Sequence, residues 1–356
     1  MTKERSHERD PSGNTRSTAS YQNRVRTLND VAKDEKTVNE FHVFERFFSD
    51  SDEYLSIGIA NIHAIVPGIE ENKEKILRVL DIFKQRKVNV AVFPEFCLTG
   101  YFWEDKTQCR RYMDTGVIEN HLDWIEDCVK PMLDDQLATI ILNNIRTGRN
   151  DKYFNSTFVI SRTHDHMIEP EIYNKIFLPG IEKTYTETGR DDRLVIETRW
   201  GRFGFTTCYD YLFSELIQEY AKIDKVDAVI QIASWRSSAR RDYAGMNVGT
   251  DTYYGDLWDM VMQSRSAVNQ IWTIACNAVG THGVTGARFW GGSGLWAPSG
   301  MKLLQASNLE EELLIIHNID IKGQRRTEMD DFNYAVDFEE IYRHVEGKCM
   351  FTRIRD

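Results

Sequence analysis

Short apolar runs alternate with helical patterns along most of this chain, and this alternation sets narrow limits on its fold. Leu55–Ala60 and Val88–Phe93 have the composition of buried strands, and between them Glu70–Arg86 repeats apolar residues at helical spacing. The same patterns predict later strands at 138–143, 155–161, 171–178, 194–198, 203–208, 228–233, 271–275, 291–296 and 313–321, and helices at 119–133, 215–221 and 257–270. Strands that alternate with helices, with antiparallel hairpins among them, predict an α/β sandwich of packed layers.

The N-terminal region differs from the rest of the chain. Residues 1 to about 40 are rich in charged and small polar residues, and such a composition cannot bury enough apolar surface to become ordered by itself. The short apolar patch Phe41–Phe48 follows and is suited to docking this segment onto the body. We therefore divide the chain into a polar extension at 1–50, either flexible or an arm on a partner subunit, and a folded domain at 51–356.

Charge and composition exclude several classes of partner and location. The chain has 44 Lys and Arg against 55 Asp and Glu, a net charge of −11, which argues against nucleic acid and anionic membrane surfaces as partners. No apolar run is long enough to cross a bilayer, and the N-terminus lacks the apolar core of a signal peptide. The six cysteines form no CxxC pair and are typical of reduced thiols. We expect a cytoplasmic protein.

Cys208 is the candidate nucleophile. The apolar strand that ends at Cys208 breaks abruptly before a helix that begins near Ser214. Unpaired backbone N–H groups at a helix N-terminus favour a thiolate, and the same groups can hold an oxyanion after the thiolate attacks carbon. Most free cysteines are small buried hydrophobes, and we keep that interpretation for the other five.

Two ionisable residues in apolar surroundings complete a catalytic set. Glu95 follows the strand Val88–Phe93, and Lys175 is embedded in the apolar run 172–178. A charged group in such a strand is costly to bury unless it is paired, so we expect each to have a partner. A glutamate, a lysine and a cysteine supply a general base, a cation for the oxyanion and a nucleophile. The alternatives are an exposed turn residue for Glu95 and an edge-strand surface lysine for Lys175.

Three motifs carry a resemblance to a known family. Phe93-Pro94-Glu95, Tyr173–Pro179 and Gly204–Asp210 resemble the Glu-Lys-Cys signature of the nitrilase (carbon–nitrogen hydrolase) superfamily, in the family's order. The resemblance covers roughly Tyr54 to the late 320s. It implies that 51–356 is a carbon–nitrogen hydrolase domain with an α-β-β-α four-layer sandwich. It also implies pairing with a second subunit across a helix face, as a homodimer or a higher homo-oligomer.

The resemblance also implies a mechanism without a metal or an organic cofactor. Glu95 takes the proton of Cys208, the thiolate attacks the substrate carbon, and Lys175 with backbone N–H groups holds the oxyanion. The family often carries a second glutamate after the lysine in an aromatic-x-Glu setting, and Tyr185-Thr186-Glu187 matches that pattern. The expected role of Glu187 is to hold Lys175 and the substrate nitrogen, and the alternative is a loop carboxylate in a charged stretch.

Residues that follow the strands are candidates for substrate binding. Tyr101, Phe102, Tyr209 and Trp235 each lie near a strand C-terminus, where α/β folds gather ligands, although core packing is the alternative for any aromatic. Arg236 is the candidate for clamping a substrate carboxylate. The loop at 242–256 is longer than expected of a minimal family member and could serve as a lid.

Residues after the nucleophile help to choose among the activities of the family. Cys208-Tyr209-Asp210 looks more like amidases than like true nitrilases, which usually show Cys-Trp-Glu. The segments 257–280 and 289–293 resemble N-carbamoyl amidohydrolases. The sequence therefore predicts a hydrolase of class EC 3.5 that acts on a small linear amide or N-carbamoyl compound through a thioester. Nitrile hydrolysis is the first alternative. A non-catalytic scaffold of the same fold is the second, disfavoured because Glu95, Lys175 and Cys208 are all present.

Overall fold

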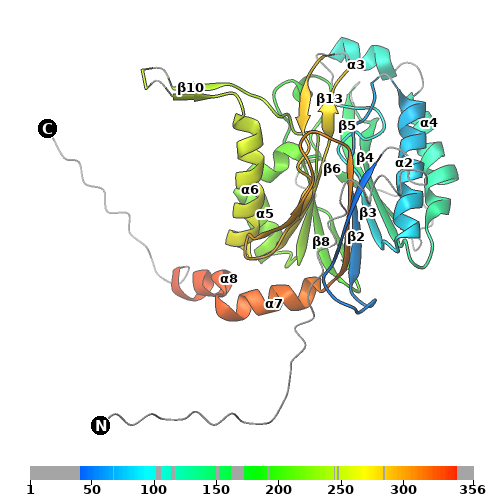
Figure 1. Ribbon diagram of the computed structural model, residues 1–356. Helices are drawn as coiled ribbons and strands as arrows, with labels where there is room; N and C mark the ends of the chain where they lie inside the picture. The colour runs from blue at the N-terminus through cyan, green and yellow to red at the C-terminus, as the bar shows by residue number, and fades with distance from the viewer. Residues whose placement is uncertain are drawn as a thin grey trace, which may run out of the picture.

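Two β-sheets packed face to face form the centre of the molecule, with helices on their outer sides (Figure 1). The computed structural model describes residues 41–66, 68–101, 106–113, 117–149, 152–161, 172–190, 193–243, 245–246, 248–283 and 285–342. None of the helices in these ranges is both long enough and apolar enough to cross a membrane.

The first sheet is mixed and has seven strands. Its spatial order is β1 (His42–Phe47), β17 (Glu312–Ile319), β2 (Leu55–Asn61), β3 (Val90–Val92), β4 (Thr139–Thr147), β5 (Tyr153–Ser161) and β6 (Ile172–Asn174). Strands β2, β3 and β4 are parallel neighbours, whereas β5 is antiparallel to both β4 and β6. As a result β3 and β6 run in the same direction and end at the same edge of the sheet.

The second sheet has six strands. Its order is β16 (Lys302–Gln305), β15 (Gly294–Trp296), β12 (Trp272–Asn277), β9 (Ala228–Ala233), β8 (Gly201–Thr207) and β7 (Val195–Thr198). Strands β8, β9 and β12 are parallel neighbours, so their carboxyl ends also meet at one edge. Two hairpins stand apart from the sheets: β10 (Arg241–Tyr243) with β11 (Val248–Thr250), and β13 (Val279–Thr281) with β14 (Arg288–Trp290).

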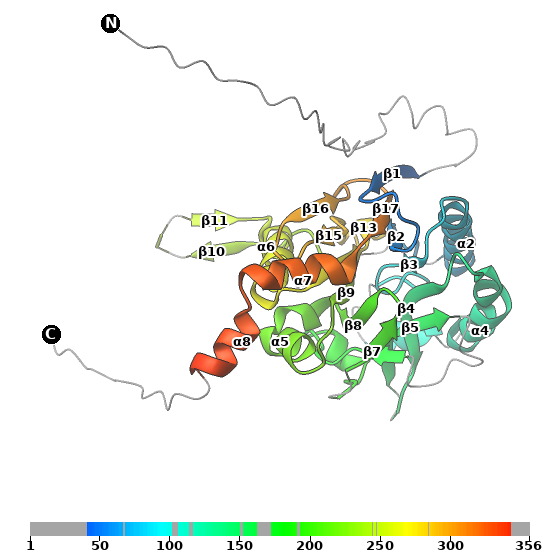
Figure 2. The ribbon, with the colours of Figure 1, turned by 90° about the horizontal axis from the view of Figure 1, so that it is seen from below.

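The helices form the outer layers. The first sheet is covered by α2 (Ile69–Gln85) and α4 (Val117–Trp124), with α3 (Lys106–Met113) at one end, and the second by α5 (Ser214–Lys222) and α6 (Tyr253–Asn269) (Figure 1). Short π or 3-10 turns lie at Ile125–Val129, Lys130–Met132, Glu182–Thr184, Cys208–Leu212 and Phe338–Tyr342. Seen from below, α7 (Ile321–Asp331) crosses the ends of the strands and α8 (Tyr334–Asp337) continues beyond it (Figure 2).

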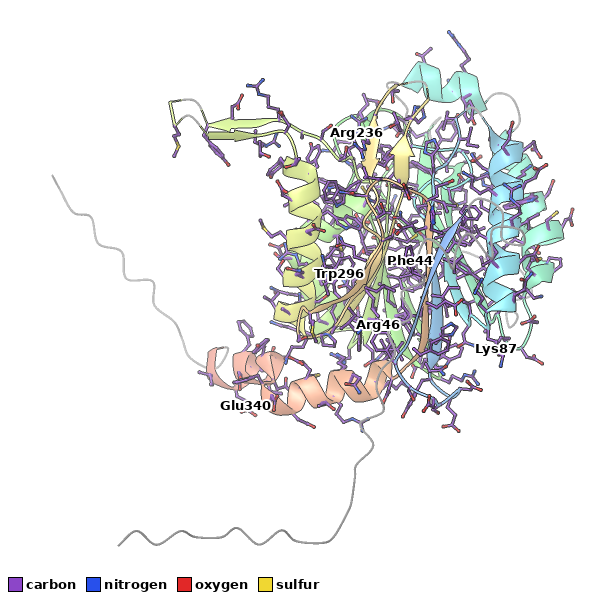
Figure 3. All side chains as sticks on the ribbon, viewed as in Figure 1. Phe44, Arg46, Lys87, Arg236, Trp296 and Glu340 are labelled. Atoms are coloured by element: carbon purple, nitrogen blue, oxygen red, sulfur yellow. The ribbon has the colours of Figure 1, made fainter. Side chains whose placement is uncertain are left out.

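Apolar burial explains the four layers. Ile57, Leu314, Ile230 and Ile274 are almost completely buried in the core between the sheets. On the outer sides, α2 turns its apolar face onto the first sheet, and Trp296 lies between the second sheet and α6 (Figure 3). Each sheet has two apolar faces, one for its partner sheet and one for its helices, which is why the strands read as continuous apolar runs. The predicted α-β-β-α sandwich is confirmed.

Some boundaries differ from those predicted. The division between residues 50 and 51 is wrong for the folded body, because β1 already pairs with β17 from His42 to Phe47. The predicted strand at 171–178 is regular only over Ile172–Asn174. The prediction that residues 1–40 form a flexible extension or an arm on a partner subunit concerns residues outside those that the structure describes. Within the expected loop at 242–256, β10 and β11 form a hairpin that projects away from the body (Figures 1 and 2), and α6 begins at Tyr253. Its role as a lid stays a prediction.

Candidate active site

Glu95, Lys175 and Cys208 lie together at the edge where the strands of the two sheets end. Glu95 follows β3, Lys175 follows β6 directly, and Cys208 follows β8 directly. Lys175 Nζ is 2.9 Å from Glu95 Oε1, and both side chains are fully buried. The Cys208 thiol donates to Glu95 and is partly exposed. The structure thus brings the three sequence-predicted residues into one cluster.

The fourth predicted residue, Glu187, does not belong to this cluster. Its carboxylate accepts a hydrogen bond from the Arg149 amide. The second carboxylate on Lys175 is that of Glu182, whose Oε2 lies 2.7 Å from Lys175 Nζ and which is fully buried. The prediction that Glu187 holds Lys175 is therefore wrong. After Pro179 the chain makes a turn into the 3-10 segment Glu182–Thr184, which directs Glu182 inward five residues before Glu187.

Three further residues hold the carboxylates in place. The Asn155 side chain donates to Glu95 Oε1 at 2.7 Å and to Glu182 Oε1 at 2.9 Å. The Ser234 amide donates to Glu95 Oε2 at 2.7 Å, and the Tyr101 hydroxyl donates to Glu182 Oε2 at 2.9 Å. Sequence reasoning missed Glu182 and Asn155. The Pro179-Gly180 pair indicates a turn after Lys175, but it does not indicate which of the following carboxylates faces the lysine.

Burial and charge determine the protonation of the cluster. Burial lowers the pKa of Lys175, but the charges of Glu182 and Glu95 more than offset this, so its pKa lies well above the ordinary value. Burial raises the pKa of Glu182, and Lys175 opposes that rise. Lys175 is therefore a fixed ammonium held between two carboxyl groups. Such a preorganised cation stabilises an oxyanion without having to reorient during the reaction.

The corner at Cys208 is strained and its thiol is protonated. Cys208 has φ of 52°, in the left-handed region that residues other than glycine seldom occupy, and it begins a 3-10 segment. Burial, followed by the charge of Glu95, raises the pKa of the thiol well above its ordinary value. The expectation that helix N–H groups would favour a free thiolate is therefore not met. A protonated thiol bound to Glu95 calls for proton removal during the attack.

A cavity of about 270 Å³ opens onto Cys208. Of the predicted binding residues, Tyr101, Tyr209, Trp235 and Arg236 line this cavity, whereas Phe102 lies outside the described residues. The other lining residues are Pro179, Gly180, Ile181, Leu212, Ser234, Tyr254 and Leu257. The walls are mainly apolar, and the exposed Arg236 is the charged side chain among the lining residues apart from Cys208, whose thiol contacts Glu95.

Arg236 differs from the other arginines of its loop. It lies at the same end of the molecule as β13 and the base of the β10–β11 hairpin (Figure 3). Nearby, Arg240 pairs with Asp242, with Nε 2.6 Å from Oδ2, and Arg241 lies over the Tyr253 ring. In the described part of the chain Arg236 has no carboxylate partner. Its guanidinium is therefore available to an anionic group at the cavity.

Comparison with known proteins shows what this chain is similar to. A family model described as carbon–nitrogen hydrolase matches residues 57–328. A probable nitrilase of Schizosaccharomyces pombe is 27% identical over 169 residues, and the alignment covers 48% of this chain and 54% of that protein. An N-carbamoylputrescine amidase of Solanum tuberosum is 24% identical over 190 residues, which are 51% of this chain and 59% of that protein. The chain thus spans little more than half the length of these two relatives.

A solved structure shows the same fold. An amidase of the nitrilase superfamily from Nesterenkonia AN1 superposes with a TM-score of 0.61 at 16% identity, covering 80% of this chain and 99% of that one. At this identity the likeness establishes the arrangement of layers and leaves the activity to be argued from the site.

Proposed function

The chain belongs to the carbon–nitrogen hydrolase family, and we propose that it hydrolyses a linear amide or an N-carbamoyl compound through a thioester on Cys208. One observation carries this proposal: the buried Lys175 ammonium lies between Glu95 and Glu182, and the Cys208 thiol bound to Glu95 faces a cavity. This arrangement joins a base, a nucleophile and an oxyanion-stabilising cation at one point.

The proposed reaction has two halves. Glu95 accepts the thiol proton while the Cys208 sulfur attacks the substrate carbon, and the resulting oxyanion is held by Lys175 and by backbone N–H groups that follow Cys208. Glu95 then protonates the leaving nitrogen, the C–N bond breaks, and a thioester remains. In the second half Glu95 takes a proton from water while the water oxygen attacks the thioester carbon. The C–S bond then breaks, the acid is released, and Glu95 returns the proton to the Cys208 sulfur. Each proton that Glu95 accepts is thus returned.

The cavity supports a substrate with an apolar middle and an anionic end. Its walls include Ile181, Leu212 and Leu257, which offer apolar contact but no hydrogen bonds from their side chains. Arg236 at the cavity suits a carboxylate, since its planar guanidinium can donate two parallel hydrogen bonds. We therefore place the scissile amide or carbamoyl group at Cys208 and a carboxylate at Arg236.

Ammonia release from a panel of amides, N-carbamoyl compounds and nitriles tests the proposal. We expect the wild type to act on amides or carbamoyl compounds, with activity lost in Cys208→Ala. Cys128→Ala, which removes an exposed thiol, is the matched control and is expected to remain active. Release from nitriles alone would assign a nitrilase. Ammonia release that persists in Cys208→Ala would contradict the mechanism. If no compound of the panel releases ammonia and Cys208 does not react with an alkylating agent, the non-catalytic scaffold is favoured.

A further inference from the structure

Asp210 connects the two segments that carry Lys175 and Cys208. It lies two residues after the nucleophile and is fully buried. Its Oδ2 accepts hydrogen bonds from the Thr207 amide at 3.0 Å and from the Tyr173 hydroxyl at 2.7 Å. Its Oδ1 accepts from the Phe177 amide at 2.7 Å. One carboxylate therefore receives three hydrogen bonds from two distant parts of the chain.

The donors to Asp210 lie next to two of the proposed catalytic residues. Tyr173 and Phe177 flank Lys175 on its two sides, and Thr207 directly precedes Cys208. Strand β6, which leads to Lys175, belongs to the first sheet, whereas β8, which leads to Cys208, belongs to the second. We propose that Asp210 is a positioning residue that fixes the Lys175 ammonium relative to the Cys208 sulfur across the two sheets. This inference rests on the function proposed above.

The same carboxylate also holds the strained corner. Thr207 and Asp210 form a reciprocal capping box, in which the side chain of each binds the backbone N–H of the other. This box keeps Cys208 in its left-handed conformation, which is costly for a residue with a Cβ. Without the box the corner can relax toward negative φ, and the thiol then moves away from Glu95. Displacement of a reacting group by 1 Å can lower a rate by about 10²-fold.

A purely electrostatic role for Asp210 predicts the opposite effect on thiol reactivity. Removing a negative charge near a thiol lowers the thiol pKa and speeds alkylation. If Asp210 instead positions the thiol against its base, its loss slows alkylation at Cys208. The direction of the change therefore separates the two roles.

Asp210→Asn tests the inference, with Asp227→Asn as the matched control. Asp227 contacts the other end of β8: its carboxylate accepts from the Arg202 amide at 2.9 Å and pairs with Arg325 at 3.2 Å. For each variant we would measure the melting temperature, the iodoacetamide alkylation rate at Cys208 by peptide mass mapping, and kcat and KM. The alkylation rate needs no substrate, so it remains informative even if the proposed function fails.

We expect Asp210→Asn to slow alkylation of Cys208 by about tenfold or more and to lower kcat by about 100-fold, with KM little changed. Asp227→Asn should lose thermal stability and keep both rates near those of the wild type. Alkylation as fast as in the wild type, or faster, would overturn the inference, and so would an equal loss in both variants. If Asp210→Asn does not fold, Tyr173→Phe removes only one donor, and an unchanged alkylation rate and kcat there would overturn the inference equally.

Discussion

Lys175 and Glu182 form an ion pair from which solvent is excluded, with Nζ of the lysine 2.7 Å from Oε2 of the glutamate. Glu95 Oε1 lies 2.9 Å from the same ammonium. A buried ion pair contributes little net stability in general, whereas removal of one partner leaves an uncompensated charge and is strongly destabilising. This cluster is therefore better explained by its position behind the Cys208 thiol than by a need for stability.

Glu182 and Glu187 should differ sharply in their importance for activity. Glu182→Gln keeps the shape of the side chain but leaves Lys175 with one carboxylate, so we expect kcat to fall by about 10²-fold or more. Among the described residues, Glu187→Gln alters a contact with the Arg149 amide, so this variant should stay near wild-type activity. The measurement is kcat of both variants, by steady-state kinetics on a substrate identified in the ammonia-release panel. Equal losses in both variants would count against the assignment of Glu182.

Asn155 is expected to matter because it binds two carboxylates at once. Asn155→Ala leaves an acceptor on Glu95 and on Glu182 without its donor, so we expect kcat to fall about 10-fold to 100-fold. Asn144→Ala is the control, since Asn144 is equally buried on β4 and accepts from Thr99. The control should lower the melting temperature while kcat remains near that of the wild type. A normal kcat in Asn155→Ala would exclude this role.

Arg236 should determine the preference for anionic substrates. Arg236→Ala removes the exposed guanidinium at the cavity, so we expect KM for a carboxylate-bearing substrate to rise about tenfold to 100-fold, and that for its neutral analogue to change little. Arg240→Ala removes a charge that is already paired with Asp242 and serves as the control. The ratio of kcat/KM for the two substrates is the quantity to measure. A ratio that is the same in wild type and Arg236→Ala would refute the carboxylate assignment.

Asp210 should make stability depend on pH in the weakly acidic range. Burial raises its pKa from 3.8 to about 6. The folded protein therefore binds this proton more tightly than the unfolded chain does, and the free energy of unfolding falls as pH rises through that window. The contribution of Asp210 to the free energy of unfolding is complete below the unfolded pKa of 3.8 and is lost above the folded pKa of about 6. At about 1.36 kcal/mol per pKa unit, this contribution is about 3 kcal/mol.

Urea unfolding of the wild type and Asp210→Asn at several pH values between about 4 and 7 tests this dependence. The difference between the two free energies of unfolding should fall as pH rises, because the asparagine does not titrate. A constant difference, or one that grows with pH, would show that Asp210 does not carry this proton.

Local sequence was sufficient to locate most of the central strands of the two sheets and the residues that follow them, but not β1, β16 or the two hairpins. The runs before Glu95 and Cys208 are mostly apolar because β3 and β8 are largely buried, and an ionisable residue at the end of such a strand stands out. Lys175 stood out for the same reason, as a lysine within an apolar run. The Phe41–Phe48 patch was recognised as a docking segment, but its sequence did not reveal that it pairs with β17, which lies far along the chain.

Tertiary structure alone decided which carboxylate faces Lys175. Glu182 and Glu187 lie in the same polar stretch, and only the direction of the turn after Pro179 sends the first inward. Asn155 and Asp210 were hidden for a related reason, because each connects groups that are distant in the chain. The local pattern of apolar and polar residues determines whether a segment is buried. Which polar groups then meet depends on how separate strands and turns pack, and no local pattern contains that information.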